Sequence, residues 1–398
     1  MHTIVRTLTV TEFHTKTVIL RSGERLPVLL DCTGIPLYGP TLFGIAEVRN
    51  RHRASNTIRN SLSALSLFHI LLTERGIDLD ARLQQGKLLE IGEIEALVSM
   101  SRRHLRSEGP PCVTADVCAT RLRTVAKYLA WLAKCRILRA DYPHTQSLQS
   151  LLKATIETIS ARLPPTRQND DPRQGLDPTL YDKAAELFAA LAPTWHDPHV
   201  KIRNQLIWEM LFHLGIRGGE LLGIRIGHIN LREGSLHIVR QADNPDDPRR
   251  VQPNTKTRAR VVPLSHVLQG RISDYILHSR RKVPGALKHD FLLVSRYGTP
   301  LSRSGLCKIF TVARERCPDL PSDVTAHVLR HTWNDRFSAE LDGKKVDPNV
   351  ETRARSYQMG WSETSKAAAA YTRRFVRAKA QQVSLELQRK SMVKESDE

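Results

Sequence analysis

The chain has 398 residues, enough for two or three domains, and its hydrophobic content of 40% supports folded cores rather than a disordered basic tail. Lys and Arg number 60 against 41 Asp and Glu, so the formal net charge is +19 and the expected partner is a polyanion. The sequence shows neither an apolar run of the ~18 residues that span a membrane nor a signal peptide, so we expect no membrane partner. The six cysteines form no C-x-x-C pair, which predicts reduced thiols and no zinc site.

Residues 1–40 are expected to form a small β-rich extension. Residues 3–10 and 17–20 are β-branched and apolar, and residues 26–30 can pair back across a turn at residues 21–24. The sequence leaves open whether this extension binds the polyanionic partner or a neighbouring subunit.

Residues 41–163 are expected to form a helical domain. Apolar residues recur at helical spacing in four stretches, over residues 58–72, 91–100, 117–132 and 148–159. Ser55 or Asn56 can cap the first helix and Gly76 can end it. Three arginines near its start are candidates for binding the polyanion: Arg51, Arg53 and Arg59. Residues 164–176 are rich in proline and polar side chains, which predicts an interdomain linker.

Residues 177–398 are expected to form a second domain with a C-terminal tail helix. Asp177 and Pro178 are typical of a helix start, and Gly215 is typical of a helix end. The elements expected between residues 206 and 295 are a helix at 206–214, a short helix at 221–224, and strands at 236–239, 260–264 and 291–295. The remainder is expected to be helical to about residue 388. The predicted fold class is therefore mainly α with a small antiparallel β-sheet (α+β).

Three segments of this second domain hold basic and aromatic residues in a fixed order. The sequence GIRGGELL at 215–222 contains Arg217 and Glu220, and HVLRHT at 327–332 places His327 and Arg330 on one face of a helix. The third segment runs from Met359-Gly360-Trp361 to Tyr371. A phenol becomes a useful nucleophile where cations stabilise its phenolate and the anionic group that it attacks. A phosphodiester is such a group, and guanidinium groups can hold its oxygens in pairs.

In this order, the three segments resemble those of the tyrosine recombinases, the phage-integrase-like site-specific recombinases. The resemblance covers roughly residues 173–385, and the helical region before it is similar to that family's core-binding, SAM-like DNA-binding domain. It implies a two-domain DNA clamp and an enzyme that breaks and rejoins DNA through a 3′-phosphotyrosine. Six catalytic residues are implied: Arg217, Lys256, His327, Arg330, Trp361 and Tyr371. Glu220 is implied to support the basic cluster from behind rather than to touch DNA.

Lys256 lies just before the predicted strand at 260–264, and the resemblance makes it the acid that protonates the departing 5′ oxygen. The alternatives are that Lys256 contacts the DNA backbone, or that Arg258 or Arg260 takes its place. Arg258 is also a candidate DNA-binding residue. The connection before Lys256 is longer than the family's short hairpin, which leaves the position of the lysine open.

The aromatic and histidine residues near the three segments have ordinary structural alternatives. Trp361 can donate its indole N–H to a phosphate or simply pack beneath the site. His331 is expected to point away from the site, Tyr357 to belong to the core and Tyr297 to lie in a turn. Tyr371 follows Trp361 by ten positions, one more than the family's usual spacing.

The expected partners are double-stranded DNA with specific recombination sites, a homotetramer on that DNA, and accessory proteins. Without a P-loop, an H-E-x-x-H motif or a carboxylate cluster, the sequence predicts no cofactor and no metal. The setting expected is the cytoplasm and nucleoid of a bacterium, and the source a phage or transposon. Two other readings remain: a type IB-like topoisomerase, and a non-catalytic DNA-binding regulator derived from a recombinase.

Overall fold

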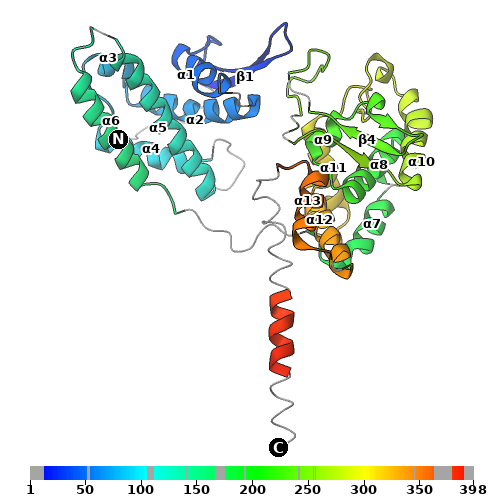
Figure 1. Ribbon diagram of the computed structural model, residues 1–398. Coiled ribbons are helices and arrows are strands. Elements are labelled where there is room, and N and C mark those ends of the chain that lie inside the picture. The colour runs from blue at the N-terminus through cyan, green and yellow to red at the C-terminus, as the bar shows by residue number, and fades with distance from the viewer. Residues whose placement is uncertain are drawn as a thin grey trace, which may run out of the picture. The chain divides into compact units, whose positions relative to one another are not determined.

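The structure is a computed structural model that describes residues 13–51, 54–104, 112–139, 141–165, 175–191, 194–240, 243–253, 255, 257–344, 346–362 and 379–389. The chain divides into two compact units, Met1–Gln168 and Asn169–Glu398 (Figure 1). The division falls in the stretch in which a linker is predicted. Each unit has its own hydrophobic core.

The first unit is a helical bundle with a β-hairpin packed on α2. Its elements are β1 (His14–Ile19), β2 (Arg25–Leu30), α1 (Tyr38–Phe43), a π-helical turn (Gly44–Arg49), α2 (Ser55–Glu74), α3 (Leu79–Gln84), α4 (Ile91–Arg102), α5 (Ala115–Ile137) and α6 (Thr145–Ala161). Apolar residues at helical spacing on α2 and α5 form the core, and Leu62, Leu65, Leu122 and Leu129 are fully buried there. The four predicted helices are confirmed.

The hairpin pairs antiparallel from His14↔Leu30 to Ile19↔Arg25, which confirms the pairing predicted across the turn at residues 21–24. Gly23 has a φ of +84° in this turn, a conformation that glycine adopts without strain. Leu29 is buried in the same core as α2 and α5. The predicted strand at residues 3–10 lies outside the described residues.

The second unit surrounds α8 with helices and one three-stranded antiparallel sheet of order β3-β4-β5. Its elements are a 3₁₀ turn (Pro178–Leu180), α7 (Tyr181–Ala190), α8 (Pro198–Leu214), α9 (Gly218–Gly223), a 3₁₀ turn (Ile226–His228), β3 (Ile229–Asn230), β4 (Ser235–Ile238), β5 (Arg260–Pro263), α10 (His266–Asp274), short π and 3₁₀ turns between Tyr275 and Lys288, α11 (Arg303–Arg316), α12 (Ala326–Gly343) and α13 (Pro348–Met359). Residues 379–389 form a further helical segment. The fold is mainly α with small antiparallel sheets, as predicted.

One predicted strand is wrong. Residues 291–295 form only isolated bridges, from Arg225 to Phe291 and from Val294 to Pro300. Two of their carbonyl groups are occupied by arginine side chains: Arg280 donates to the oxygen of Phe291 at 2.9 Å and Arg203 to that of Val294 at 3.0 Å. The segment is apolar because it is buried. The two arginine side chains bond to carbonyl oxygens that a neighbouring strand would otherwise use.

The described residues can be searched for membrane-spanning helices and for metal-binding groups. Among them, no helix is both long and apolar enough to cross a membrane. Within the same part of the chain, the His, Cys, Asp and Glu side chains form no group of three or more that could hold a metal ion.

Candidate active site

Arg217 sits at the junction of two helices. Helix α8 ends at Gly215, whose φ is +62°, and a Cβ at this position would lie 2.6 Å from the ring of Trp333. The chain turns there, and α9 begins directly after Arg217. The backbone N–H of Arg217 donates to Glu220 Oε2 at 2.9 Å, while its side chain is 35% exposed. The guanidinium of Arg217 is therefore accessible to a ligand, although the backbone that carries it is fixed.

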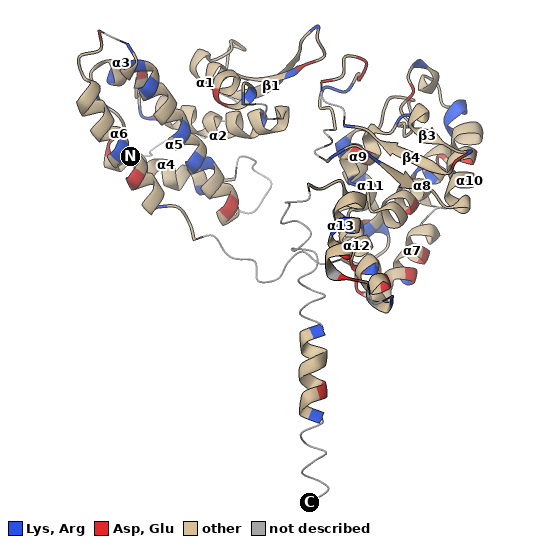
Figure 2. Ribbon diagram, viewed as in Figure 1, with Lys and Arg blue, Asp and Glu red and all other residues tan. Residues whose placement is uncertain are grey.

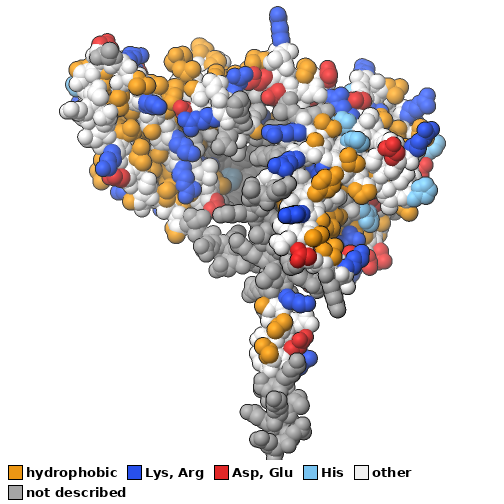
Figure 3. Space-filling view, in the orientation of Figure 1, with side chains coloured by type: hydrophobic (Ala, Val, Ile, Leu, Met, Phe, Trp, Pro, Cys, Tyr) orange, Lys and Arg blue, Asp and Glu red, His pale blue; other side chains and the backbone are white. Residues whose placement is uncertain are grey.

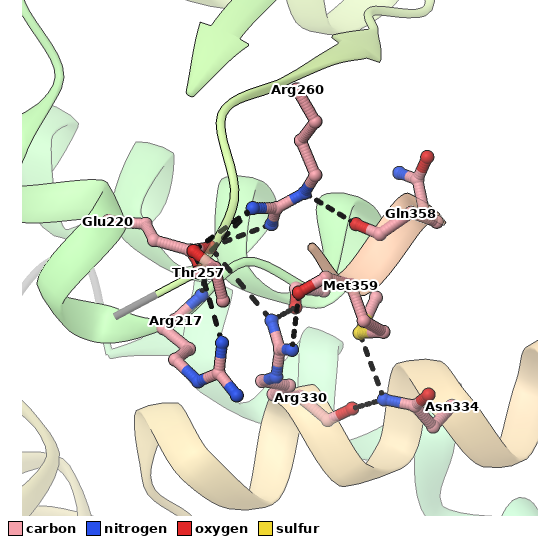
Figure 4. Close-up of polar contacts among 9 residues, drawn as sticks. Arg217, Glu220, Thr257, Arg260, Arg330, Asn334, Gln358 and Met359 are labelled. Carbon is pink, nitrogen blue, oxygen red and sulfur yellow. Dashed lines mark hydrogen bonds and ion pairs between the residues drawn. The ribbon is translucent and has the colours of Figure 1, made fainter. Parts of the chain in front are cut away.

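Glu220 is the buried centre of the cluster (Figure 4). Its Oε2 accepts a hydrogen bond from Arg260 Nη2 at 2.8 Å and its Oε1 accepts one from the Thr257 hydroxyl at 2.5 Å. Arg330 Nη1 is 3.9 Å from Oε2 and Arg217 Nη1 is 3.7 Å from Oε1. Burial alone would raise the pKa of Glu220, but the hydrogen bond and charge of Arg260, the charge of Arg330 and the Thr257 hydroxyl together lower it. Glu220 is thus an ionised carboxylate that orders basic groups around itself.

Arg330 is anchored in the first turns of α12. It is fully buried, and it donates to the carbonyl oxygens of Gly215 at 2.8 Å and Met359 at 3.2 Å. These bonds join the first and third motif segments. His327, three positions earlier on the same helix, is exposed.

His331 is buried, which agrees with the expected structural role, but it does not point away from His327 as expected. Its ring centroid lies 4.5 Å from that of His327, and His331 is only 9% exposed. Residues four apart on a helix lie on the same side, so the two imidazoles meet edge to face.

Helix α13 delivers the third segment and ends at Gly360, with a φ of +65°. Trp361 then turns back into the unit: it is 7% exposed and its backbone N–H donates to Ser356 O at 2.8 Å. Its ring packs with Met359 and Trp333, and the Arg330 guanidinium lies 5.7 Å from its centroid. Tyr371 lies outside the described residues. Placing Tyr357 in the core is wrong, because it is 63% exposed.

The β4–β5 hairpin is joined to the end of α13. The backbone N–H of Arg258 donates to Gly360 O at 3.0 Å, and Arg260 Nε donates to Gln358 O at 2.6 Å. Arg258 itself is exposed, as expected of a DNA-binding candidate. Lys256 lies outside the described residues, but its neighbours Thr255 and Thr257 are both buried.

Arg260 and Thr257 are site residues that sequence reasoning did not identify. The sequence indicates Arg260 only as an alternative to the lysine acid, yet its side chain is 1% exposed and paired with Glu220. That geometry suits a support for the cluster and not a proton donor to DNA. The signal in the sequence is weak: an arginine at the start of an amphipathic strand gives no indication of a partner 40 residues away.

The DNA-binding candidates of the first unit are placed as follows. Arg51 is exposed and pairs with Glu47 at 2.5 Å, Arg59 donates to the Thr17 hydroxyl of β1 at 2.9 Å, and Arg53 lies outside the described residues. A basic face that the sequence did not single out lies on α5, where the exposed residues Arg123, Lys127 and Lys134 recur at helical spacing. Figure 2 shows basic residues along this helix, and Figure 3 shows exposed basic side chains on the visible face of both units.

The chemistry of the cluster is that of an anion site. Three arginines (Arg217, Arg260 and Arg330) surround one carboxylate, Glu220, so three positive charges less one negative charge leave +2. Arg217 Nη1 is buried and lies 3.7 Å from Glu220 Oε1, and it makes no hydrogen bond within the described part of the chain. Such a site stabilises an anionic oxygen whose charge grows during a reaction.

Known proteins resemble this chain in the region that contains the arginine cluster. Residues 180–376 match the Phage integrase family. The tyrosine recombinase XerD of Halalkalibacterium halodurans is 25% identical over 142 residues, 36% of this chain and 42% of that protein. XerD of Shewanella oneidensis is 22% identical over 239 residues, which are 58% of this chain and 71% of that protein. The putative integrase/recombinase y4rF of Sinorhizobium fredii is 26% identical over 223 residues, which are 55% of this chain and 43% of that protein. The first and last of these alignments span less than half of the relative.

Two solved structures share the fold. XerH site-specific recombinase bound to palindromic difH substrate in a post-cleavage complex has a TM-score of 0.51 at 16% identity, over 84% of this chain and 80% of that one. The integrase of transposon Tn1549 in complex with circular intermediate DNA has a TM-score of 0.51 at 15% identity, and the match covers 85% of this chain and 98% of that one. The family-model match shows that residues 180–376, which contain all three motif segments, belong to the phage integrase family of tyrosine recombinases.

Proposed function

We propose that this protein is a site-specific DNA recombinase or integrase of a phage or transposon. It cleaves and rejoins double-stranded DNA at specific recombination sites through a 3′-phosphotyrosine intermediate. The observation that carries the proposal is the cluster in which Arg217 and Arg330, from separate motif segments, are both ordered by buried Glu220. A preformed cationic site of this kind serves a reaction in which negative charge develops on phosphate oxygens.

In the proposed reaction, the Tyr371 oxygen attacks phosphorus and the bond to the 5′ oxygen breaks. Arg217 and Arg330 hold the non-bridging oxygens, while His327 and Trp361 donate hydrogen bonds to them. Because Arg330 is fully buried and donates to the carbonyl oxygens of Gly215 and Met359, its contact with phosphate requires these groups to rearrange when DNA binds. Lys256 gives the 5′ oxygen its proton. The energy of the broken bond is retained in the phosphotyrosine, so a 5′ hydroxyl from a second duplex can reverse the step without a cofactor or a metal.

The units have different tasks in this proposal. The second unit carries the chemistry, and the first unit contributes affinity for DNA through α5 and through Arg51, Arg53 and Arg59. Exchange between two duplexes needs four strand breaks, so we infer a homotetramer on DNA, assisted where required by accessory proteins. The proposed setting is the bacterial cytoplasm, in association with the nucleoid.

The direct test is covalent trapping on DNA. Wild-type protein should form an adduct on nicked suicide duplexes that carry a recombination site, whereas Tyr371→Phe should bind the same DNA and form none, because only the nucleophilic oxygen is lost. Mapping the adduct by mass spectrometry identifies the nucleophile. The exposed phenol of Tyr357 supplies the matched control, since Tyr357→Phe should cleave at the wild-type rate.

The same assay separates the proposal from its rivals. An adduct that reseals only its own duplex indicates a topoisomerase, and strand exchange between two duplexes indicates a recombinase. Binding without any adduct from wild-type protein indicates a DNA-binding regulator and rejects the proposal.

A further inference from the structure

The connection between β4 and β5 is long, but several of its side chains are buried against the second unit. It runs from residue 239 to residue 259, whereas hairpin loops ordinarily have about two to five residues. Three of its side chains are nevertheless buried: Asp247 is 2% exposed, Gln252 is 7% and Arg249 is 9%. The middle of the connection is therefore held against the second unit.

Arg249 makes this attachment with all of its guanidinium nitrogens. Nε and Nη2 donate to the two carboxylate oxygens of Asp247 at 2.9 and 2.8 Å. Nη1 donates to the carbonyl oxygens of Leu222 and Leu301, each at 2.9 Å. The guanidinium also lies over the ring of Phe291, 4.5 Å from its centroid. A buried arginine with these planar, paired contacts is held in one geometry.

The attachment reaches the helix that starts at the active site. Leu222 belongs to α9, the helix that begins after Arg217 and contains Glu220. Further along the connection, Thr257 donates its hydroxyl to Glu220 at 2.5 Å. Arg249 and Thr257 thus both bond to the same short helix, and Lys256 lies between them in the sequence.

We propose that Arg249 is a positioning residue for Lys256: by pinning the connection to α9, it sets where the lysine ammonium meets the 5′ oxygen. This inference rests on the proposed strand-transfer function. In that step the bond from the Tyr371 oxygen to phosphorus forms, the bond from phosphorus to the 5′ oxygen breaks, the ammonium protonates this oxygen and the phenol releases its proton to solvent. Misplacing a catalytic group by about 1 Å costs about 10²-fold in rate.

The test uses two substrates that differ in one atom. A duplex is recovered from a random-sequence library by covalent trapping on wild-type protein, and is resynthesised with sulfur in place of the 5′ oxygen at the mapped phosphate. A thiolate leaves without a proton, so a defect confined to proton donation disappears on this substrate. Arg249→Ala should form the adduct about 10²-fold more slowly than wild type on the oxygen substrate, and within about threefold of wild type on the sulfur substrate. Lys256→Ala should show the same pattern.

Arg225 offers a matched control. Its guanidinium lies over the same Phe291 ring at 4.8 Å, but it pairs with Asp290, outside the β4–β5 connection, at 2.9 Å. Arg225→Ala should therefore cleave both substrates at the wild-type rate. Thermal melting shows whether Arg249→Ala folds. If it does not, Asp247→Asn takes its place in the test, because it removes the counter-charge of Arg249 with little change of shape.

The outcomes are distinct. Equal losses on the two substrates would mean that Arg249 supports the whole site and would overturn the inference, as would a wild-type rate for Arg249→Ala on the oxygen substrate. If wild-type protein traps no duplex from the library, the proposed function itself fails.

Discussion

At the scale of single residues, the carboxylate of Glu220 joins three parts of the second unit. It binds the backbone of Arg217, the Thr257 and Arg260 side chains of the hairpin region, and lies near Arg330 of α12. Its side chain is 0% exposed, so guanidinium groups rather than water balance its charge. Removing the charge would leave Arg260 buried beside a neutral group, which is unfavourable.

We therefore predict that Glu220→Gln lowers the free energy of unfolding of the second unit by about 3–5 kcal/mol. The pKa of Glu220 is lower in the folded protein than its ordinary value of 4.5. Its contribution to stability is thus present above about pH 4.5 and is lost as the pH falls through the lower, folded-state pKa. Calorimetric unfolding of wild type and Glu220→Gln across this range measures both effects, because the variant lacks the titrating carboxylate. A variant as stable as wild type at pH 7 would show that the cluster does not depend on this charge.

How far the site follows from the sequence depends on how local its contacts are. Arg217 and Glu220 are three positions apart, as are His327 and Arg330, so short motifs identify them. Arg249, by contrast, reaches carbonyl groups 27 and 52 residues away. Contacts over such distances depend on the tertiary fold, so no local pattern indicates them.

At the scale of secondary-structure elements, apolar spacing predicts α8, which leads to Arg217, whereas for α12 and α13 the sequence predicts only a helical remainder. Gly215 ends α8 in the left-handed conformation, as predicted. Asp177 does cap a turn, but the turn is 3₁₀ and α7 begins only at Tyr181. The prediction of a strand at 291–295 is wrong because a buried segment is apolar whether or not it pairs with a neighbouring strand. Helix α10, with His266, Gln269, Gly270 and Arg271 among nine residues, has too few apolar positions to be predicted.

The packing of α2 against α5 gives a second pH prediction. The ring of His69 lies within 5.9 to 6.2 Å of Phe13, Phe68 and Tyr128. Burial lowers the pKa of His69 to about 4, below its ordinary value of 6.5. The fold thus favours the neutral imidazole, and this stabilisation is complete above pH 6.5 and is lost as the pH falls from 6.5 toward 4.

We predict that the first unit loses up to about 3 kcal/mol of unfolding free energy over this range. His69→Phe keeps an aromatic ring and removes the titration, so its first unit should lose less stability between pH 6.5 and 4. Calorimetry at several pH values measures the difference. Parallel pH profiles for the two proteins would show that His69 is not the group responsible.

At the scale of the whole molecule, the charge of +19 predicts a DNA affinity that depends on salt. Each phosphate contact releases counterions, so log K should fall steeply and linearly with log salt concentration. Arg123→Ala and Lys127→Ala, on the basic face of α5, should each reduce the slope by about 1 and weaken binding to all sequences alike. Fluorescence anisotropy with labelled duplexes measures these slopes.

A surface lysine in acidic surroundings is the matched control for α5. Lys183 on α7 is exposed between Asp182 and Glu186, and Lys183→Ala should leave the slope unchanged. A nearly flat salt dependence of the wild-type protein, or equal effects of Lys183 and Lys127 substitutions, would contradict a specific basic face.

The C-terminal tail is the last feature at this scale. Its described part, residues 379–389, is helical, and Val383 and Leu387 lie four positions apart on one side with exposures of 45% and 61%. An amphipathic helix gains stability by burying such a stripe, on its own catalytic unit or on a second copy of the chain. A tail that docks on a neighbouring subunit would link each active site to the next in a tetramer.

We predict that truncation after Arg374 leaves binding to a single DNA site intact but abolishes strand exchange between two sites. Replacing Val383 and Leu387 together with serine should have the same effect, because it removes the apolar stripe and keeps the helix. Gln382→Ser, on a different side of that helix, is the control and should recombine normally. Gel-shift titration measures binding, and conversion of a two-site plasmid measures exchange. Wild-type exchange by the truncated protein would mean that the tail does not couple the subunits, and that its apolar stripe contributes only to its own chain.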